Sequence, residues 1–170
     1  MKIELKNFKC SKFASQETLC FEASVYIDGK PEGTVSNSGT GGSNLFHPYE
    51  TGVRIQRYAE TLPPIPPEDL PFEADTPMAM HADMLISKLC EDIMASKDLK
   101  HLIGSSVVWV AADGRVYQTR GINKTVMGQL ATAGVDAMRK VAGIQNESKA
   151  ILLNTLPFDE ALALFKKHST

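Results

Sequence analysis

The stretch "SNSGTGGSN", residues 36–44, holds residues whose type and spacing could bind a ligand. Three glycines fall within four positions, and small hydroxyl residues surround them. Backbone N–H groups in such a turn can surround an anion, and a helix starting near Pro48 would add a favourable potential. We therefore predict a ligand- or partner-binding site here, formed by Ser38, Gly39, Thr40, Gly41, Gly42, Ser43, Asn44 and His47.

The pattern of this stretch differs from the known phosphate-binding motifs. It is neither G-x-x-x-x-G-K-[ST] nor G-x-G-x-x-G, it contains no lysine, and the strand before it is expected to be antiparallel. Three interpretations stay open: a turn whose glycines serve backbone geometry, a protein-contact loop, and a phosphate or nucleotide site. Because glycines and small hydroxyl residues cannot pack a core, we expect an exposed loop that is mobile without a partner.

Other catalytic and metal-binding patterns are missing from the sequence. The four histidines, at 47, 81, 101 and 168, lack the spacing of a helical zinc site, and no G-x-S-x-G motif occurs. The adjacent carboxylates Glu91 and Asp92 diverge on a helix, so they cannot work as an acid–base pair. We expect no metal and no cofactor, and a non-enzymatic role more than a catalytic one, although catalytic groups can converge from distant segments.

Composition and charge exclude further classes. The chain has 170 residues, 43% hydrophobic and 22% charged, with a net charge of -2, so we do not expect nucleic acid as a partner. A basic and aromatic cluster near Trp109, Arg115 and Tyr117 permits base stacking, but an amphipathic hairpin with Trp109 in the core explains it better. No apolar run reaches the ~18 residues of a membrane span, so we expect no membrane partner.

The three cysteines, Cys10, Cys20 and Cys90, have no metal-type spacing. Free thiols in a reducing compartment are the simplest explanation. No N-terminal apolar stretch resembles a signal peptide. We therefore expect three free thiols and a cytoplasmic location.

The elements that would position the candidate site form the N-terminal part, residues 1–62. Leu19, Phe21, Ala23, Val25 and Ile27 alternate onto one face, as in an amphipathic strand. With strands before and after it, this segment predicts an antiparallel three-stranded meander. A helix should follow from Pro48, capped by Asn44 or His47, with Tyr49 on its apolar side.

Residues 63–77 carry six prolines and four acids, which predict a semi-rigid connector. The alternative is an SH3-type ligand, because Pro64 and Pro67 satisfy PxxP. The remaining residues, 78–170, predict a leading helix from Thr76–Pro77 and then a β-β-α-β-α half. Its hairpin would have a type I′ turn at Asp113–Gly114, and "AILLN" would be a strand in the sheet interior. The fold class is therefore α+β, with about six strands and four helices.

Two parts of the sequence resemble a known family. The stretches "FASQETLCFEASVYIDGKPEGTVSNSGTGGSN", "HPYE" and "LPFDEALALF" are similar to small bacterial and prophage-associated proteins of uncharacterised function. The similarity covers the first 50 residues and, more loosely, the last 20. This family has His at the position of Thr40 and Trp at that of Tyr49. The resemblance implies a bacterial or phage cytosolic protein.

Together these observations predict a small protein that acts by binding another bacterial protein. In a prophage-like setting, it would modulate or inhibit a host or defence factor. The alternative is a binder of a phosphorylated small molecule or nucleotide signal at residues 38–44. The sequence predicts no particular oligomeric state.

Overall fold

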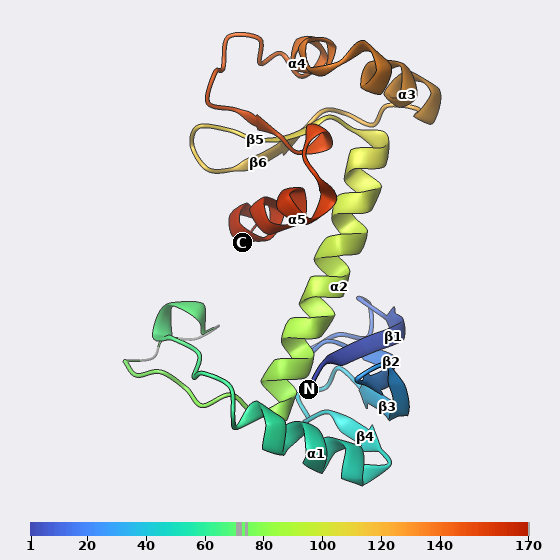
Figure 1. The fold of residues 1–170 in the computed structure, drawn as a ribbon, viewed down its shortest axis with the longest axis vertical. Coiled ribbons are helices and arrows are strands. Elements are labelled where there is room, and N and C mark those ends of the chain that lie inside the picture. The colour runs from blue at the N-terminus through green and yellow to red at the C-terminus, as the bar shows by residue number, and fades with distance from the viewer. Residues whose placement is uncertain (71–72, 74, 170) are drawn as a thin grey trace. The chain divides into compact units, whose positions relative to one another are not determined.

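The structure is a computed structural model that describes residues 1–70, 73 and 75–169. It confirms the α+β class, and the described residues contain seven strands in two antiparallel sheets and five α-helices (Figure 1). The predicted counts of six strands and four helices were each one too low. The chain forms two compact units, residues 1–92 and 93–170, and the boundary falls inside helix α2 (Ala82–Ser105).

The first unit contains a four-stranded sheet in which sequence order equals spatial order. The strands are β1 (Ile3–Cys10), β2 (Phe21–Ile27), β3 (Lys30–Asn37) and β4 (Leu45–His47), all antiparallel. The predicted meander lacked β4, which is too short to show periodicity and is defined by its pairing with β3. The alternation in β2 is confirmed, because four of the five predicted residues are buried: Phe21, Ala23, Val25 and Ile27. The fifth, Leu19, lies before the strand and is half-buried.

The type I′ hairpin turn occurs at Asp28–Gly29 and not at the predicted place. These residues have φ values of 48° and 80° and join the paired residues Ile27 and Lys30. At Asp113–Gly114, only Gly114 has a positive φ, 79°. There the Gly114 N–H donates to the Ala111 carbonyl over 3.0 Å, and the Ala111 N–H donates to the Arg115 carbonyl, which is typical of a three-residue loop with a bulge.

Helix α1 (Tyr49–Ala59) packs through small residues, which explains why its predicted apolar stripe was partly wrong. Thr51, Gly52, Ile55 and Ala59 are buried, whereas Tyr49 is 76% exposed. A Cβ on Gly52 would lie 2.7 Å from the Phe46 ring, so the helix approaches β4 closely. The N-cap is Pro48, without a side-chain cap, so the predicted capping by Asn44 or His47 is wrong.

The two ends of the proline-rich segment are paired with each other. Ile65 and Met78 form an antiparallel bridge, in which the N–H of each donates to the carbonyl of the other over 2.8 and 2.9 Å. A 3-10 turn, η1 (Pro67–Asp69), lies between them, and residues 71, 72 and 74 of the predicted connector are outside the described residues. Because Met78 is held extended, α2 begins at Ala82, later than the predicted start near Thr76–Pro77.

The second unit contains a three-stranded sheet with β5 (Val108–Val110) in the centre. The edges are β6 (Val116–Gln118) and β7 (Ile151–Leu152). The predicted interior strand "AILLN" is therefore an edge strand of two residues, followed by the 3-10 turn η2 (Leu153–Thr155). The side chain of Asn154 ends the pairing here, because its Oδ1 accepts the Val108 N–H over 2.7 Å.

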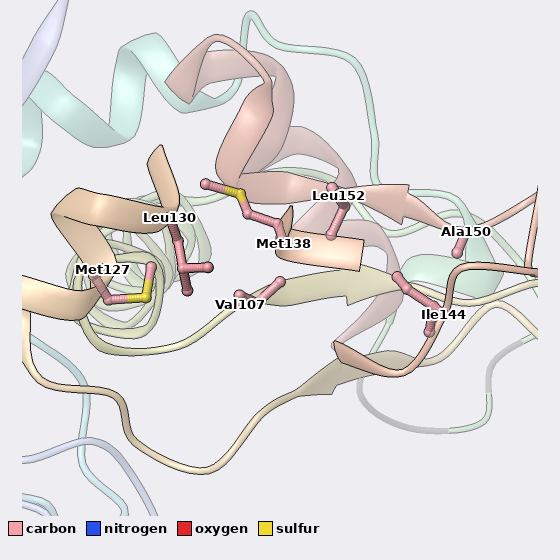
Figure 2. Close-up of a cluster of buried hydrophobic side chains, with 7 residues drawn as sticks. All are labelled: Val107, Met127, Leu130, Met138, Ile144, Ala150 and Leu152. Atoms are coloured by element: carbon pink, nitrogen blue, oxygen red, sulfur yellow. The ribbon is translucent and has the colours of Figure 1, made fainter. Parts of the chain in front are cut away.

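Helices cover both faces of this sheet. On one face, Val107 and Leu152 pack with helices α3 (Lys124–Ala133) and α4 (Val135–Ala142). The buried side chains of this cluster are Val107, Met127, Leu130, Met138, Ile144, Ala150 and Leu152 (Figure 2). On the other face, Val108 and Val110 pack with helix α5 (Phe158–His168) and Leu99 of α2. We expected a single helix for α3 and α4, but Gly134 has φ 91° and ψ -173°, which interrupts it.

Candidate functional site

The loop of residues 38–44 joins β3 to β4 and is organised around Asn37, the last residue of β3. The side chain of Asn37 is buried. Its Oδ1 accepts the Gly39 N–H over 2.9 Å and the Thr18 hydroxyl over 2.8 Å. Its Nδ2 donates to the Gly42 carbonyl over 2.8 Å and to Asn44 Oδ1 over 3.1 Å. One amide therefore fixes both ends of the glycine-rich stretch.

Gly39 docks this loop onto the segment between β1 and β2. Its carbonyl accepts the N–H groups of Gln16, Glu17 and Thr18 over 2.8, 3.0 and 3.3 Å. Gly39 has φ 87°, and a Cβ at this position would overlap the Ala14 carbonyl oxygen and lie 2.9 Å from Cys20 Cβ. Only glycine fits here, both in backbone conformation and in space.

The other two glycines differ in what they require. Gly41 has φ 91°, and a Cβ there would overlap the carboxylate of Glu17, which is the movable end of a long side chain. Gly42 has no positive φ, and a Cβ on it would meet nothing within 4 Å. The three glycines therefore range from obligatory at Gly39 to replaceable at Gly42.

Three of the backbone donors of the loop are used inside the protein. Besides the Gly39 N–H, the Gly41 N–H donates to Thr18 Oγ1 over 3.3 Å, and the Asn44 N–H donates to Asp83 Oδ1 over 2.9 Å. Two carboxylates, Glu17 and Asp83, thus lie beside the loop. Strand β4 also separates the loop from the N-terminus of α1 in the chain. This geometry gives no support to an anion cradle, because these three N–H groups already have acceptors and the two carboxylates would repel an anion.

The outer side of the loop is open to solvent. Ser38, Thr40, Gly41, Gly42 and Ser43 are exposed, and the hydroxyls of Ser38 and Thr40 lie 2.9 Å apart. The loop is thus exposed, as expected, and its hydrogen bonds tie it to the residues around it. His47 is exposed on β4 opposite Thr34 and takes no part in this network of hydrogen bonds.

A shallow groove runs from the loop across the outer face of the sheet. Directly opposed residues of antiparallel strands share a face, so Lys9, Glu22, Ser36 and Leu45 form one row across all four strands. This row lines a groove of about 420 Å³ together with Cys10, Ser11, Cys20, Phe21, Asn37 and Ser38.

Two large apolar side chains project beside the loop. Leu45, at the end of the groove, is 69% exposed. Phe13 is 100% exposed and belongs to the segment that Gly39 holds through residues 16–18. Exposed phenylalanine and leucine side chains bury apolar surface when a partner covers them.

The three cysteines are free thiols, as predicted. Cys10 and Cys20 line the groove, whereas Cys90 is buried. Burial raises the pKa of the Cys90 thiol from 9.0 to about 12, and the neighbouring Glu91 adds to this. Cys90 is therefore a protonated core residue at neutral pH and not a nucleophile.

Within the described part of the chain, no three His, Cys, Asp or Glu side chains are grouped so that they could hold a metal ion. Over the same residues, no helix combines the length and apolar character that crossing a bilayer requires.

Sequence reasoning located the loop but missed the residues that shape it. Neither Asn37 nor the segment 14–18 is among the residues predicted for the site. The Asn37 side chain bonds to Gly39, two residues on, which is a common local pattern for asparagine and could have been anticipated. The contact with Thr18 could not, because it joins segments that only the fold brings together.

Comparisons of this chain with protein-family models, with curated protein sequences and with solved structures gave no match.

Proposed function

We propose that this protein binds another protein through a surface formed by loop 38–44 and the two exposed apolar residues, Phe13 and Leu45. This set is called the loop surface below. The observation that carries the proposal is the full exposure of Phe13 beside a loop that hydrogen bonds hold in one conformation.

Two physical arguments support a protein partner. Burying an exposed phenylalanine or leucine side chain contributes about 1.5–3 kcal/mol, which is large for a single contact. Because internal hydrogen bonds already order the loop, binding would lose little conformational entropy. The polar residues Ser38, Thr40 and Ser43 would then form a rim around the apolar anchors.

The resemblance of the first 50 residues suggests a bacterial protein as the partner, and modulation or inhibition of a host or defence factor as the consequence. A phosphate or nucleotide ligand at the loop gains no support from the geometry, because three of the loop N–H groups have internal partners and carboxylates lie nearby. We therefore do not propose it as a second function.

The test is a pull-down from a lysate of the native bacterial host with wild-type protein, Phe13→Ser and Leu45→Ser. Val141→Ser is the matched control, because Val141 is an apolar side chain on α4 that is 48% exposed and lies outside the loop surface. We expect a protein that wild type and Val141→Ser retain and that both other variants lose. Retention of the same proteins by all four baits would refute the proposal.

A further inference from the structure

We propose that the second unit, residues 93–170, binds an extended acidic peptide segment that adds a strand to the free edge of β6. This site lies in a different unit from the loop surface and does not depend on the function proposed above.

The backbone of β6 has an unpaired side. In antiparallel pairing, residues alternate between facing the neighbouring strand and facing away from it. Arg115 and Thr119 bond to β5 and its flanks, since the Ala111 N–H donates to the Arg115 carbonyl and the Thr119 N–H donates to the Val107 carbonyl, each over 3.0 Å. The alternate residues, Val116 and Gln118, therefore direct their N–H and C=O groups away from β5, where β6 is the edge of the sheet.

A groove lies beside this edge. Its volume is about 500 Å³, within the range of ligand sites, and apolar side chains form its floor. The floor is the margin of the core that α5 shares with the sheet, and consists of Leu102, Val108, Val116 and Phe165.

Val116 and Gln118 contribute both to the groove and to the free strand edge. Val116 and Gln118 line the groove with their side chains and have the outward backbone groups. A strand that pairs with them would place its own alternate side chains over the groove, which is how sheet edges bind peptides in other proteins.

The charge around the groove selects an acidic occupant. Arg115 and His168 line it, and none of the described lining residues is a carboxylate. The nearest acid along the chain, Asp113, already accepts the Arg115 N–H over 3.0 Å and the Tyr117 hydroxyl over 2.9 Å, and these bonds lower the pKa of its carboxyl. The imidazole of His168 lies beside the hairpin, since a Cβ on Gly114 would lie 3.6 Å from its Nδ1.

The expected occupant is therefore an extended segment with acid, apolar and acid side chains on one face. The apolar side chain would cover the floor, and the two carboxylates would reach Arg115 and His168. The sequence Asp-Ser-Val-Ser-Asp has this pattern, because successive side chains of a strand point to opposite faces.

The test is an NMR titration of the full-length, ¹⁵N-labelled protein with the blocked peptide Gly-Asp-Ser-Val-Ser-Asp-Gly. We expect saturable shifts at the amides of residues 115–118 and 165–168. The Lys-Ser-Val-Ser-Lys counterpart should bind at least tenfold more weakly. In an added antiparallel strand, the Val amide faces β6 and the Ser amides face away, so N-methylation of Val should abolish binding and N-methylation of both Ser should not.

Protein variants test the charge argument. Arg115→Glu should weaken binding of the acidic peptide at least tenfold, whereas Arg120→Glu, the same charge change at an exposed residue outside the groove lining, should leave binding within twofold. The proposal is overturned by any of three results: no shifts at about 2 mM peptide, the range of the weakest specific contacts; equal binding of the lysine peptide; or indifference to N-methylation of Val.

Discussion

The side-chain amide of Asn37 makes four hydrogen bonds, and each reaches a different part of the candidate site. They join the loop backbone at Gly39 and Gly42 and the side chains of Thr18 and Asn44. Gly39 in turn holds the segment that carries Phe13. The exposed phenylalanine and the polar loop are thus connected through two buried residues, Asn37 and Gly39.

The glycines of the loop should differ in their effect on stability. Gly39→Ala should lower the free energy of unfolding by about 1–3 kcal/mol, because the new Cβ meets the Ala14 carbonyl and φ is positive. Gly42→Ala is the matched control and should change stability by less than about 0.5 kcal/mol, because its Cβ meets nothing. Urea denaturation measures both. Equal effects of the two substitutions would contradict this account of the loop.

Cys90 should make stability depend on pH above its unfolded pKa. The folded chain holds the thiol proton more tightly, since burial raises its pKa from 9.0 to about 12. Its contribution is therefore fully present below pH 9 and is lost as pH rises towards 12, by up to about 1.4 kcal/mol per pH unit.

This contribution can be isolated with Cys90→Ala, which removes the thiol. Urea denaturation from about pH 8 to 10.5 should show the stability advantage of wild type over the variant shrinking above pH 9. Parallel pH profiles of the two proteins would show that Cys90 titrates alike in the folded and unfolded chains.

At the scale of elements, one helix start is defined by a single side chain. Asn123 is the N-cap of α3, and its Oδ1 accepts the Val126 N–H over 2.9 Å. Asn123→Ala should lower stability by about 1 kcal/mol, whereas Thr125→Ala, a substitution inside the first turn, should lower it little. Thermal denaturation of the two variants checks this, and a larger loss in Thr125→Ala would place the cap elsewhere.

Elements with a strong local pattern could be predicted from the sequence. The alternation in β2 and the start of α5 after Pro157 both follow from their own residues. Strand β4 and edge strand β7 could not be predicted correctly, because three or two residues show no period and strand order depends on distant pairing. The break at Gly134 was missed because the apolar spacing continues through it. For the candidate site, the loop residues were predictable, but the contacts of Asn37, Thr18 and Asp83 arise only in the folded chain.

At the scale of the whole molecule, each of the two compact units contains fully buried side chains of its own. Val35 of β3 and Val107 beside β5 are both completely buried. Since local stability follows local packing, the two units need not open together. Helix α2 contributes residues to both units.

Val35→Ala and Val107→Ala are a matched pair that tests whether the units unfold separately. Each should lower stability by about 1–3 kcal/mol. Amide hydrogen exchange should show reduced protection in residues 1–92 for Val35→Ala and in residues 93–170 for Val107→Ala. Loss of protection along the entire chain in both variants would mean one cooperative unit.

The bridge between Ile65 and Met78 has a practical consequence for protein engineering. Because the chain leaves and returns at paired positions, residues 66–77 can be replaced by a guest sequence whose ends are close together. Doubling the length of such a loop costs only about 0.6 kcal/mol in closure entropy. A small fluorescent reporter inserted there would leave both chain ends free for purification tags, and the loop surface and the edge of β6 unaltered in sequence.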